Sequence, residues 1–255
     1  MWMAAAACVV ALMPTLIIWA AVGATFAQIY AAPNPPAAWR AFRRNSLACI
    51  HASRLFRPAI DVNPEAQLLR IEGRPAVYVM NHFPVALLDT VTIPLLEVPC
   101  RIVAACDGVP GIGRAYRKLD SITVRPGGGN TDRILAEAHR AITQGRSVVV
   151  FGEGRHVGRK RRWDEVVDLQ LGAFLIAVQE QCPVVPVALC DPVAAYGLVR
   201  PSALLAPLLG PLWAHPFAMR VLEPLHPHAF ANSPHRLRDA ARAILQRALQ
   251  TPLHH

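Results

Sequence analysis

A histidine directly after a short apolar segment is the strongest indication of chemistry in this chain of 255 residues. Asn81 and His82 follow residues 76–80, a wholly apolar run that predicts a buried strand. Pro84 suits the first turn of a helix, so His82 is expected at a strand-to-helix turn. In a parallel sheet such turns form the carboxyl edge, where ligand sites tend to lie. A histidine there can accept a proton from an alcohol near neutral pH.

A histidine base needs an acidic neighbour that holds its tautomer, and Asp89 is the nearby candidate. Six residues separate His82 from Asp89. If residues 82–89 were all helical, the two side chains would lie about 10 Å apart along the helix axis, too far for a hydrogen bond. Either His82 lies in a loop that folds back, which Pro84 permits, or Asp89 is not its partner. A surface histidine and an unrelated aspartate on a helix explain this motif equally well.

Two further segments contain residues that could bind a phosphate group. Glu153, Gly154 and Arg155 follow a strand predicted over residues 147–151, and Arg125 follows another predicted strand directly before a run of glycines. Glycine lets the backbone bend and approach a ligand closely. Arginine offers a planar fork of donors that matches phosphate oxygens. The alternative for each segment is a solvated charged loop.

From about residue 70 onward, short apolar strands alternate with helices. Strands are predicted over residues 76–80, 101–104, 121–124, 147–151, 184–189 and 219–222, and helices over 131–143, 169–180 and 234–249, with a further helix beginning near residue 84. This alternation predicts an α/β fold with a mostly parallel central sheet flanked by helices.

The N-terminal segment differs in composition from the rest of the chain. Residues 1–38 carry no charged side chain and are long enough to cross a bilayer, which predicts a hydrophobic membrane anchor. A cleaved signal peptide and a hairpin bent at Pro14 are the alternatives. The arginines that follow in residues 39–70 predict a basic amphipathic helix at the membrane interface, or an ordinary helix packed on the domain. Residues 71–255 are then expected to form the catalytic domain, on the cytoplasmic side by the positive-inside tendency.

Four blocks in this order resemble the glycerolipid acyltransferases of the PlsC type, over residues 70–245. They are residues 81–89, 113–125, 147–154 and 172–188. The resemblance implies that His82 deprotonates an acceptor hydroxyl, which attacks the thioester of acyl-CoA or acyl carrier protein, while Asp89 orients His82. It further implies that Arg125, Glu153 and Gly154 help to bind the acceptor phosphate, without a metal or a cofactor beyond the acyl donor.

The chain departs from the family pattern at two places. The family has four residues between its histidine and aspartate, whereas six lie between His82 and Asp89. Gly152 replaces the family's proline, and Arg155 stands one position before the family's arginine. The displaced arginine favours an acceptor other than a simple lysophosphatidate, such as an amino-acid-containing lysolipid. The resemblance predicts acyl transfer to a lysophospholipid or a related lysolipid, with Arg155 in the phosphate site. The alternative is a non-catalytic lipid-binding protein on the same fold.

The whole-chain composition agrees with a membrane-lipid partner. Hydrophobic residues make up 53% of the chain, charged residues 17%, and the formal net charge is +9. A basic excess favours anionic lipid headgroups or nucleic acid, and nucleic acid is disfavoured because no aromatic residues alternate with the basic ones at residues 155–162. The six cysteines form no C-x-x-C pair, so free and mostly buried thiols are expected.

Overall fold

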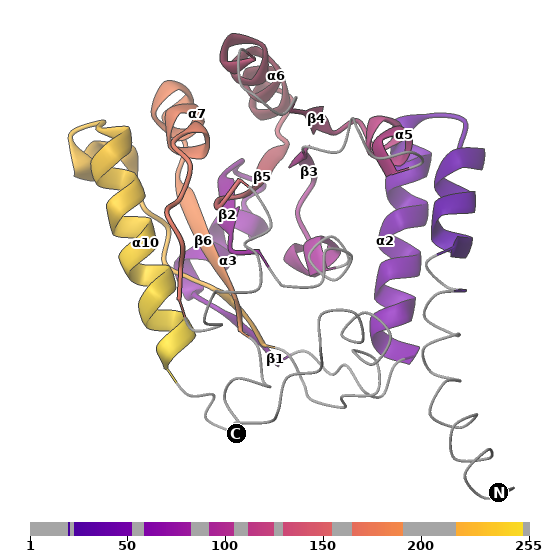
Figure 1. Ribbon diagram of the computed structural model, residues 1–255, viewed down its shortest axis with the longest axis horizontal. Helices are drawn as coiled ribbons and strands as arrows, with labels where there is room; N and C mark the ends of the chain where they lie inside the picture. Colours follow the sequence, from indigo (N-terminus) through magenta and orange to yellow (C-terminus); the bar gives the residue numbers. More distant parts are fainter. Residues whose placement is uncertain are drawn as a thin grey trace, which may run out of the picture.

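The computed structural model describes residues 20, 23–52, 59–82, 92–104, 112–124, 130–154, 165–190 and 218–251 (Figure 1). Its strands are β1 (Ala59–Val62), β2 (Val77–Met80), β3 (Cys100–Ala104), β4 (Ile122–Thr123), β5 (Ser147–Phe151), β6 (Val184–Cys190) and β7 (Ala218–Val221). Its helices are α2 (Pro35–Ala52), α3 (Pro64–Ile71), α5 (Ile112–Lys118), α6 (Thr131–Thr143), α7 (Gly172–Glu180) and α10 (Pro234–Gln250), with short 3-10 helices η1 (Ile93–Leu96) and η3 (Pro227–Phe230).

The strands form one seven-stranded sheet in the order β1-β7-β6-β2-β5-β3-β4. The pairings from β6 through β4 are all parallel, whereas β6 and β7 pair in antiparallel fashion and β1 runs parallel to β7. Every residue of β2, β6 and β7 is buried, as expected for strands covered on both faces. The prediction of an α/β fold with a mostly parallel sheet is confirmed.

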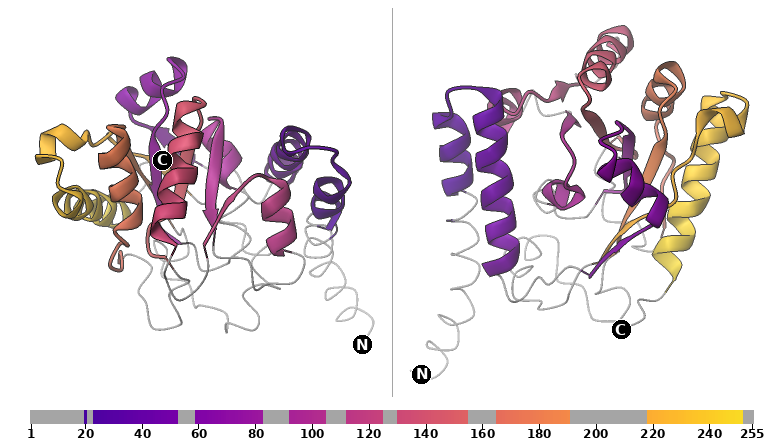
Figure 2. Two further views of the ribbon diagram at one scale, coloured as in Figure 1. Left: turned by 90° about the horizontal axis from the view of Figure 1, so that it is seen from above. Right: turned by 180° about the vertical axis from the view of Figure 1, so that it is seen from behind.

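The alternation of side chains along β2 separates two apolar cores. Val77 and Val79 face the core that α6, α7 and α10 complete, which also contains Leu169. Tyr78 and Met80 face the other core, which α3 and η1 complete. Figure 2 shows α3 and the row formed by α6, α7 and α10 on opposite sides of the sheet. Helices on both faces exclude water from the sheet and leave its strand ends as the accessible edges.

The N-terminal helices pack together beside the sheet. The helix over residues 23–31 lies along α2, and Ile29 packs with Phe42 of α2 and Leu119, which follows α5 (Figure 2). Lys118 donates to the carbonyl of Ala32 at 3.0 Å. Most of the predicted anchor, residues 1–19 and 21–22, lies outside the described residues. Among the helices that the structure does describe, none is both long and apolar enough to cross a membrane.

The apolar side of α2 packs against protein, while its arginines are exposed. Phe42 is only 4% exposed, and Trp39 and Leu47 pack against the core on the α3 face of the sheet. Arg40, Arg43 and Arg44 are exposed. Hence α2 packs on the domain through its apolar side and exposes these three arginines.

The amino edge of the sheet carries a network of ion pairs. The Arg101 side chain, 7% exposed, pairs with Asp120 at 3.1 Å and with Glu137 at 2.8 Å. Its Nε and Nη1 also donate to the carbonyls of Asp120 and Glu137. Arg146 pairs with Asp120 at 2.6 Å and donates to the carbonyl of Cys100. These bonds link the start of β3 to α6, so the buried arginine is paired on several sides.

Candidate functional site

The candidate site lies at the carboxyl edge of the sheet, where β2 ends between β5 and β6. After the last paired residues of β2 and β5, the Gly152 amide donates to the Met80 carbonyl at 2.8 Å. Asn81 follows, 3% exposed, and its amide group bonds to the backbone of Leu189 in β6. Its side-chain oxygen accepts from the Leu189 amide at 2.7 Å, and its nitrogen donates to the Leu189 carbonyl at 3.1 Å. The chain therefore leaves β2 in a fixed position.

His82 is the next residue and is half-buried. Its backbone amide donates to Oε2 of Glu153 at 3.2 Å. Its ring stacks on Phe151, the last residue of β5, with centroids 4.8 Å apart and an angle of 16° between the planes. Because Phe151 packs against the core on the α3 face, the His82 ring lies on that side of the sheet as well. The structure thus brings together His82 and Glu153, two of the residues that the sequence singles out.

The turn after β5 depends on two glycines. An added Cβ at Gly152 would lie 2.7 Å from Val79 Cγ1 and 2.9 Å from Leu169 Cδ2, so no side chain fits without a shift of both neighbours. A proline there would also lose the amide that bonds to Met80. Gly154 has φ +68°, a conformation that strains other residues. Between them, Glu153 is 2% exposed.

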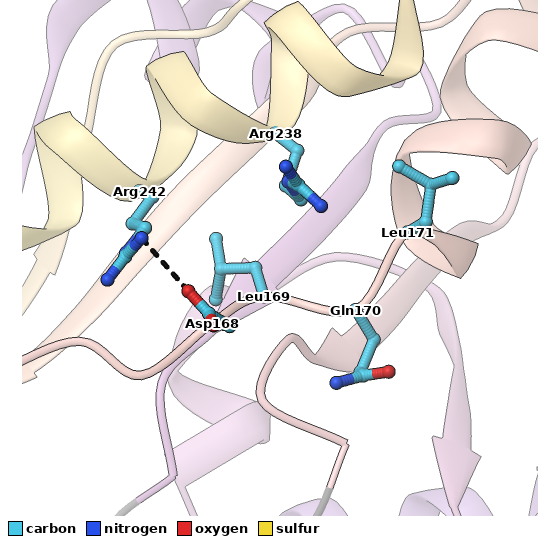
Figure 3. Close-up of a pocket in the computed structure, with 6 residues that line it drawn as sticks. All are labelled: Asp168, Leu169, Gln170, Leu171, Arg238 and Arg242. Atoms are coloured by element: carbon cyan, nitrogen blue, oxygen red, sulfur yellow. Dashed lines mark ion pairs between the residues drawn. The ribbon is translucent and has the colours of Figure 1, made fainter.

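A pocket of about 340 Å³ lies between α10 and the segment before α7. It is lined by Asp168, Leu169, Gln170, Leu171, Arg238 and Arg242 (Figure 3). Figure 3 shows Arg242 reaching across to Asp168, with which it pairs at 2.9 Å. Leu169 belongs to the core on the α6, α7 and α10 face, opposite the face of the His82 ring. This pocket is therefore not the space into which a substrate of His82 would fit.

The cysteines within the described residues whose burial is known are free and buried, as predicted: Cys100, Cys182 and Cys190. Burial raises the pKa of Cys100 and of Cys182 to about 12, and it also raises the pKa of Cys190. Burial likewise raises the pKa of Tyr78 to about 12, and the nearby Cys100 adds to this shift. A thiol must ionise to act as a nucleophile, so these three thiols are unsuited to catalysis near neutral pH.

Three predicted site residues, Asp89, Arg125 and Arg155, lie outside the described residues. Their roles, and the pairing of Asp89 with His82 across six intervening residues, stay predictions. Sequence reasoning quoted Asn81 without giving it a role, and it missed the stacking of His82 on Phe151. The signal for Asn81 was its place: an amide side chain directly after a buried strand must find partners, because unpaired buried polar groups are costly.

Fold and site together define an α/β domain that presents a histidine at the carboxyl edge of its central parallel strands. The family model described as Acyltransferase matches residues 60–190, which is just over half of the chain and includes β2, His82, β5 and β6. The chain therefore belongs to this acyltransferase family.

Among solved structures, the crystal structure of the 1-acyl-sn-glycerophosphate (LPA) acyltransferase PlsC from Thermotoga maritima is similar, with a TM-score of 0.60. The two sequences are 17% identical, and the alignment covers 95% of each chain. At this identity the likeness establishes the fold. No curated protein sequence matches the chain. Family match and shared fold confirm the resemblance to the PlsC-type acyltransferases that the four sequence blocks indicate.

Proposed function

We propose that this protein transfers a fatty-acyl group from acyl-CoA or acyl carrier protein to the hydroxyl of a lysophospholipid or a related lysolipid, in membrane lipid synthesis. The observation that carries the proposal is the placement of His82. Its backbone is bonded to Glu153 and its ring stacks on Phe151, at the carboxyl edge of an acyltransferase domain. A base held at this edge suits proton transfer from a bound alcohol.

In the proposed reaction His82 takes the proton of the acceptor hydroxyl as the oxygen attacks the thioester carbonyl. The new ester bond forms, the carbon–sulfur bond breaks, and the proton passes from His82 to the departing thiolate. Asp89 orients His82, and Arg125, Arg155 and Gly154 contribute to the site for the acceptor phosphate. General base catalysis of this kind contributes roughly 10²- to 10⁴-fold to the rate.

We also propose that the protein acts at a membrane, with residues 1–38 as anchor and the catalytic domain on the cytoplasmic side. The exposed Arg40, Arg43 and Arg44 on α2 support contact with anionic headgroups, each contributing about 1 kcal/mol near such a surface. Because the apolar side of α2 is packed against protein, this helix would contribute charge rather than inserted apolar side chains.

The test compares wild type with His82→Ala in acyl transfer from labelled acyl-CoA, or from acyl carrier protein, to a panel of lysolipids. We expect the variant to lose about 10²- to 10⁴-fold in kcat. The matched control is His139→Ala, because His139 also contacts a glutamate, Glu180, but joins α6 to α7. Equal transfer by wild type and His82→Ala would remove His82 from the mechanism. Lipid binding without any transfer by the wild type would favour the non-catalytic alternative.

A further inference from the structure

The two residues that follow β2, Asn81 and His82, are hydrogen-bonded to both neighbouring strands or the turns after them. On the β6 side, the buried Asn81 side chain makes two hydrogen bonds to the backbone of Leu189. On the β5 side, the Glu153 carboxyl group accepts the His82 amide. The regular ladder has ended here, so side chains replace the backbone partners that a longer strand would have supplied.

The Glu153 carboxyl group lies buried beside the backbone of His82. It is 2% exposed, and Oε2 points at the backbone of His82. This contact supports a role of Glu153 in placing His82, and the headgroup role that the family resemblance implies stays a prediction.

We propose that Glu153 and Asn81 are positioning residues. They hold the backbone of His82, and through it the imidazole ring, at hydrogen-bond distance from the acceptor hydroxyl. This inference rests on the proposed function. A base acts efficiently only at hydrogen-bond distance from the proton it removes, and a displacement of about 1 Å can cost about 100-fold in rate. Because the ring stacks on Phe151, a shift of the His82 backbone would move the imidazole relative to this contact.

Two Glu153 variants separate the positioning role from a role of the charge. Glu153→Gln keeps the shape and an acceptor oxygen for the His82 amide, so we expect kcat within about threefold of wild type. Glu153→Leu removes the acceptor at nearly the same volume, and we expect kcat to fall by about 10- to 100-fold while KM for the acceptor changes little.

Asn81→Leu removes both bonds to Leu189, and we expect a comparable fall in kcat. The matched control for the Glu153 variants is Ser147→Ala, at the amino end of the β2–β5 pair. Ser147 Oγ accepts the Ala76 amide at 3.2 Å and is 3% exposed, so it makes an equivalent bond far from His82. Its removal is expected to lower stability and to leave kcat of the folded protein unchanged.

A readout that needs no activity is hydrogen exchange at the His82 amide. Full-length protein labelled with ¹⁵N-histidine gives one signal per histidine, and the His82 signal is identified by its loss in His82→Gln. We expect exchange of this amide to accelerate at least tenfold in Glu153→Leu and to stay near wild type in Glu153→Gln.

The proposal is overturned if Glu153→Gln loses as much kcat as Glu153→Leu while its His82 amide stays protected, since the charge would then be the feature required. It is also overturned if Glu153→Leu raises KM for the acceptor at unchanged kcat, which would indicate a headgroup contact. If the wild type transfers no acyl group, the proposed function fails, and exchange at His82 still decides whether Glu153 holds the backbone.

Discussion

At both ends of the β2–β5 pair, a backbone amide of the β2 segment donates to a side-chain oxygen of the β5 segment, but the two bonds differ in what they position. At the amino end the Ala76 amide donates to Ser147 Oγ, and at the carboxyl end the His82 amide donates to Glu153 Oε2, both at 3.2 Å. At the amino end the donor residue is a buried alanine, whereas at the carboxyl end it is a histidine whose ring stacks on Phe151. The same kind of bond thus stabilises the sheet at one edge and places a potential base at the other.

The edges differ also in how their charged groups are used. At the amino edge Arg101 and Arg146 are paired with Asp120, and Arg101 additionally with Glu137, so the charges bond mainly to one another. At the carboxyl edge the Glu153 carboxyl group bonds to the backbone of the residue proposed as base. We therefore expect changes at the amino edge to lower stability at constant catalysis, and changes at the carboxyl edge to lower both.

The largest expected effect on stability is at Arg101. Arg101→Met removes the buried guanidinium from Asp120, Glu137 and two carbonyl groups. Because both carboxylates are partly exposed and keep a second arginine partner, we expect a loss of about 1.5–3 kcal/mol, as for hydrogen bonds to a charged group. The free energy of unfolding from denaturant titration measures this loss. The kcat of the protein that remains folded should equal that of wild type. A fall in kcat at unchanged stability would contradict the division between the two edges.

The next effect concerns the turn that carries Glu153. Gly152→Ala forces Val79 and Leu169 apart, which costs about 1–3 kcal/mol, and by shifting Glu153 it should also lower kcat. Gly172→Ala is the matched control, because an added Cβ there meets no atom within 4 Å and lies in α7. The control should be neutral or slightly stabilising in thermal unfolding. Full activity in Gly152→Ala, with the stability loss as expected, would show that the turn tolerates displacement.

Much of the sheet was predictable, because the buried strands are continuous apolar runs bounded by turns. The strands from β2 to β7 were each found within a few residues of their predicted positions, and α6 covers the predicted residues 131–143. β1 was missed because it is a short edge strand containing Asp61 and the exposed Ile60. α3 was missed although Asn63 caps it and proline occupies its first turn, a recognisable helix start.

The site was predictable in part, for a physical reason. A residue that directly follows a predicted parallel strand lies at the carboxyl edge. His82 and Glu153 could therefore be predicted as site candidates from the order of the elements. Which atoms meet there depends on strand order, since β2 lies between β5 and β6 only after distant segments have paired. Hence neither the bond from His82 to Glu153 nor that from Asn81 to Leu189, residues 71 and 108 positions apart, could be read from the chain.

A smaller effect is expected from Ser147→Ala, the counterpart of the Glu153 variants. The loss of the hydroxyl leaves the buried Ala76 amide without this acceptor, at a cost of about 1–2 kcal/mol in unfolding free energy. Denaturant midpoints with an unchanged slope would measure it. An unaltered kcat supports the division of labour between the edges, whereas a loss as large as in Glu153→Leu would mean that any weakening of β2 disturbs the site.

The smallest effect at moderate pH comes from a thiol at the amino edge. Burial raises the pKa of Cys100 to about 12 in the folded state, whereas the pKa of this thiol in the unfolded chain is 9.0. Between these values the unfolded state binds fewer protons, so this contribution is complete below pH 9 and is lost progressively as the pH rises to 12. By pH 10 the loss is about 1 kcal/mol. Cys100→Val should make unfolding free energy less dependent on pH in this window, as measured by denaturant titration, without changing kcat at pH 8. Cys182 and Tyr78, whose pKa values burial also raises to about 12, would keep their own share of the alkaline loss in this variant. An unchanged pH dependence would contradict the contribution of Cys100.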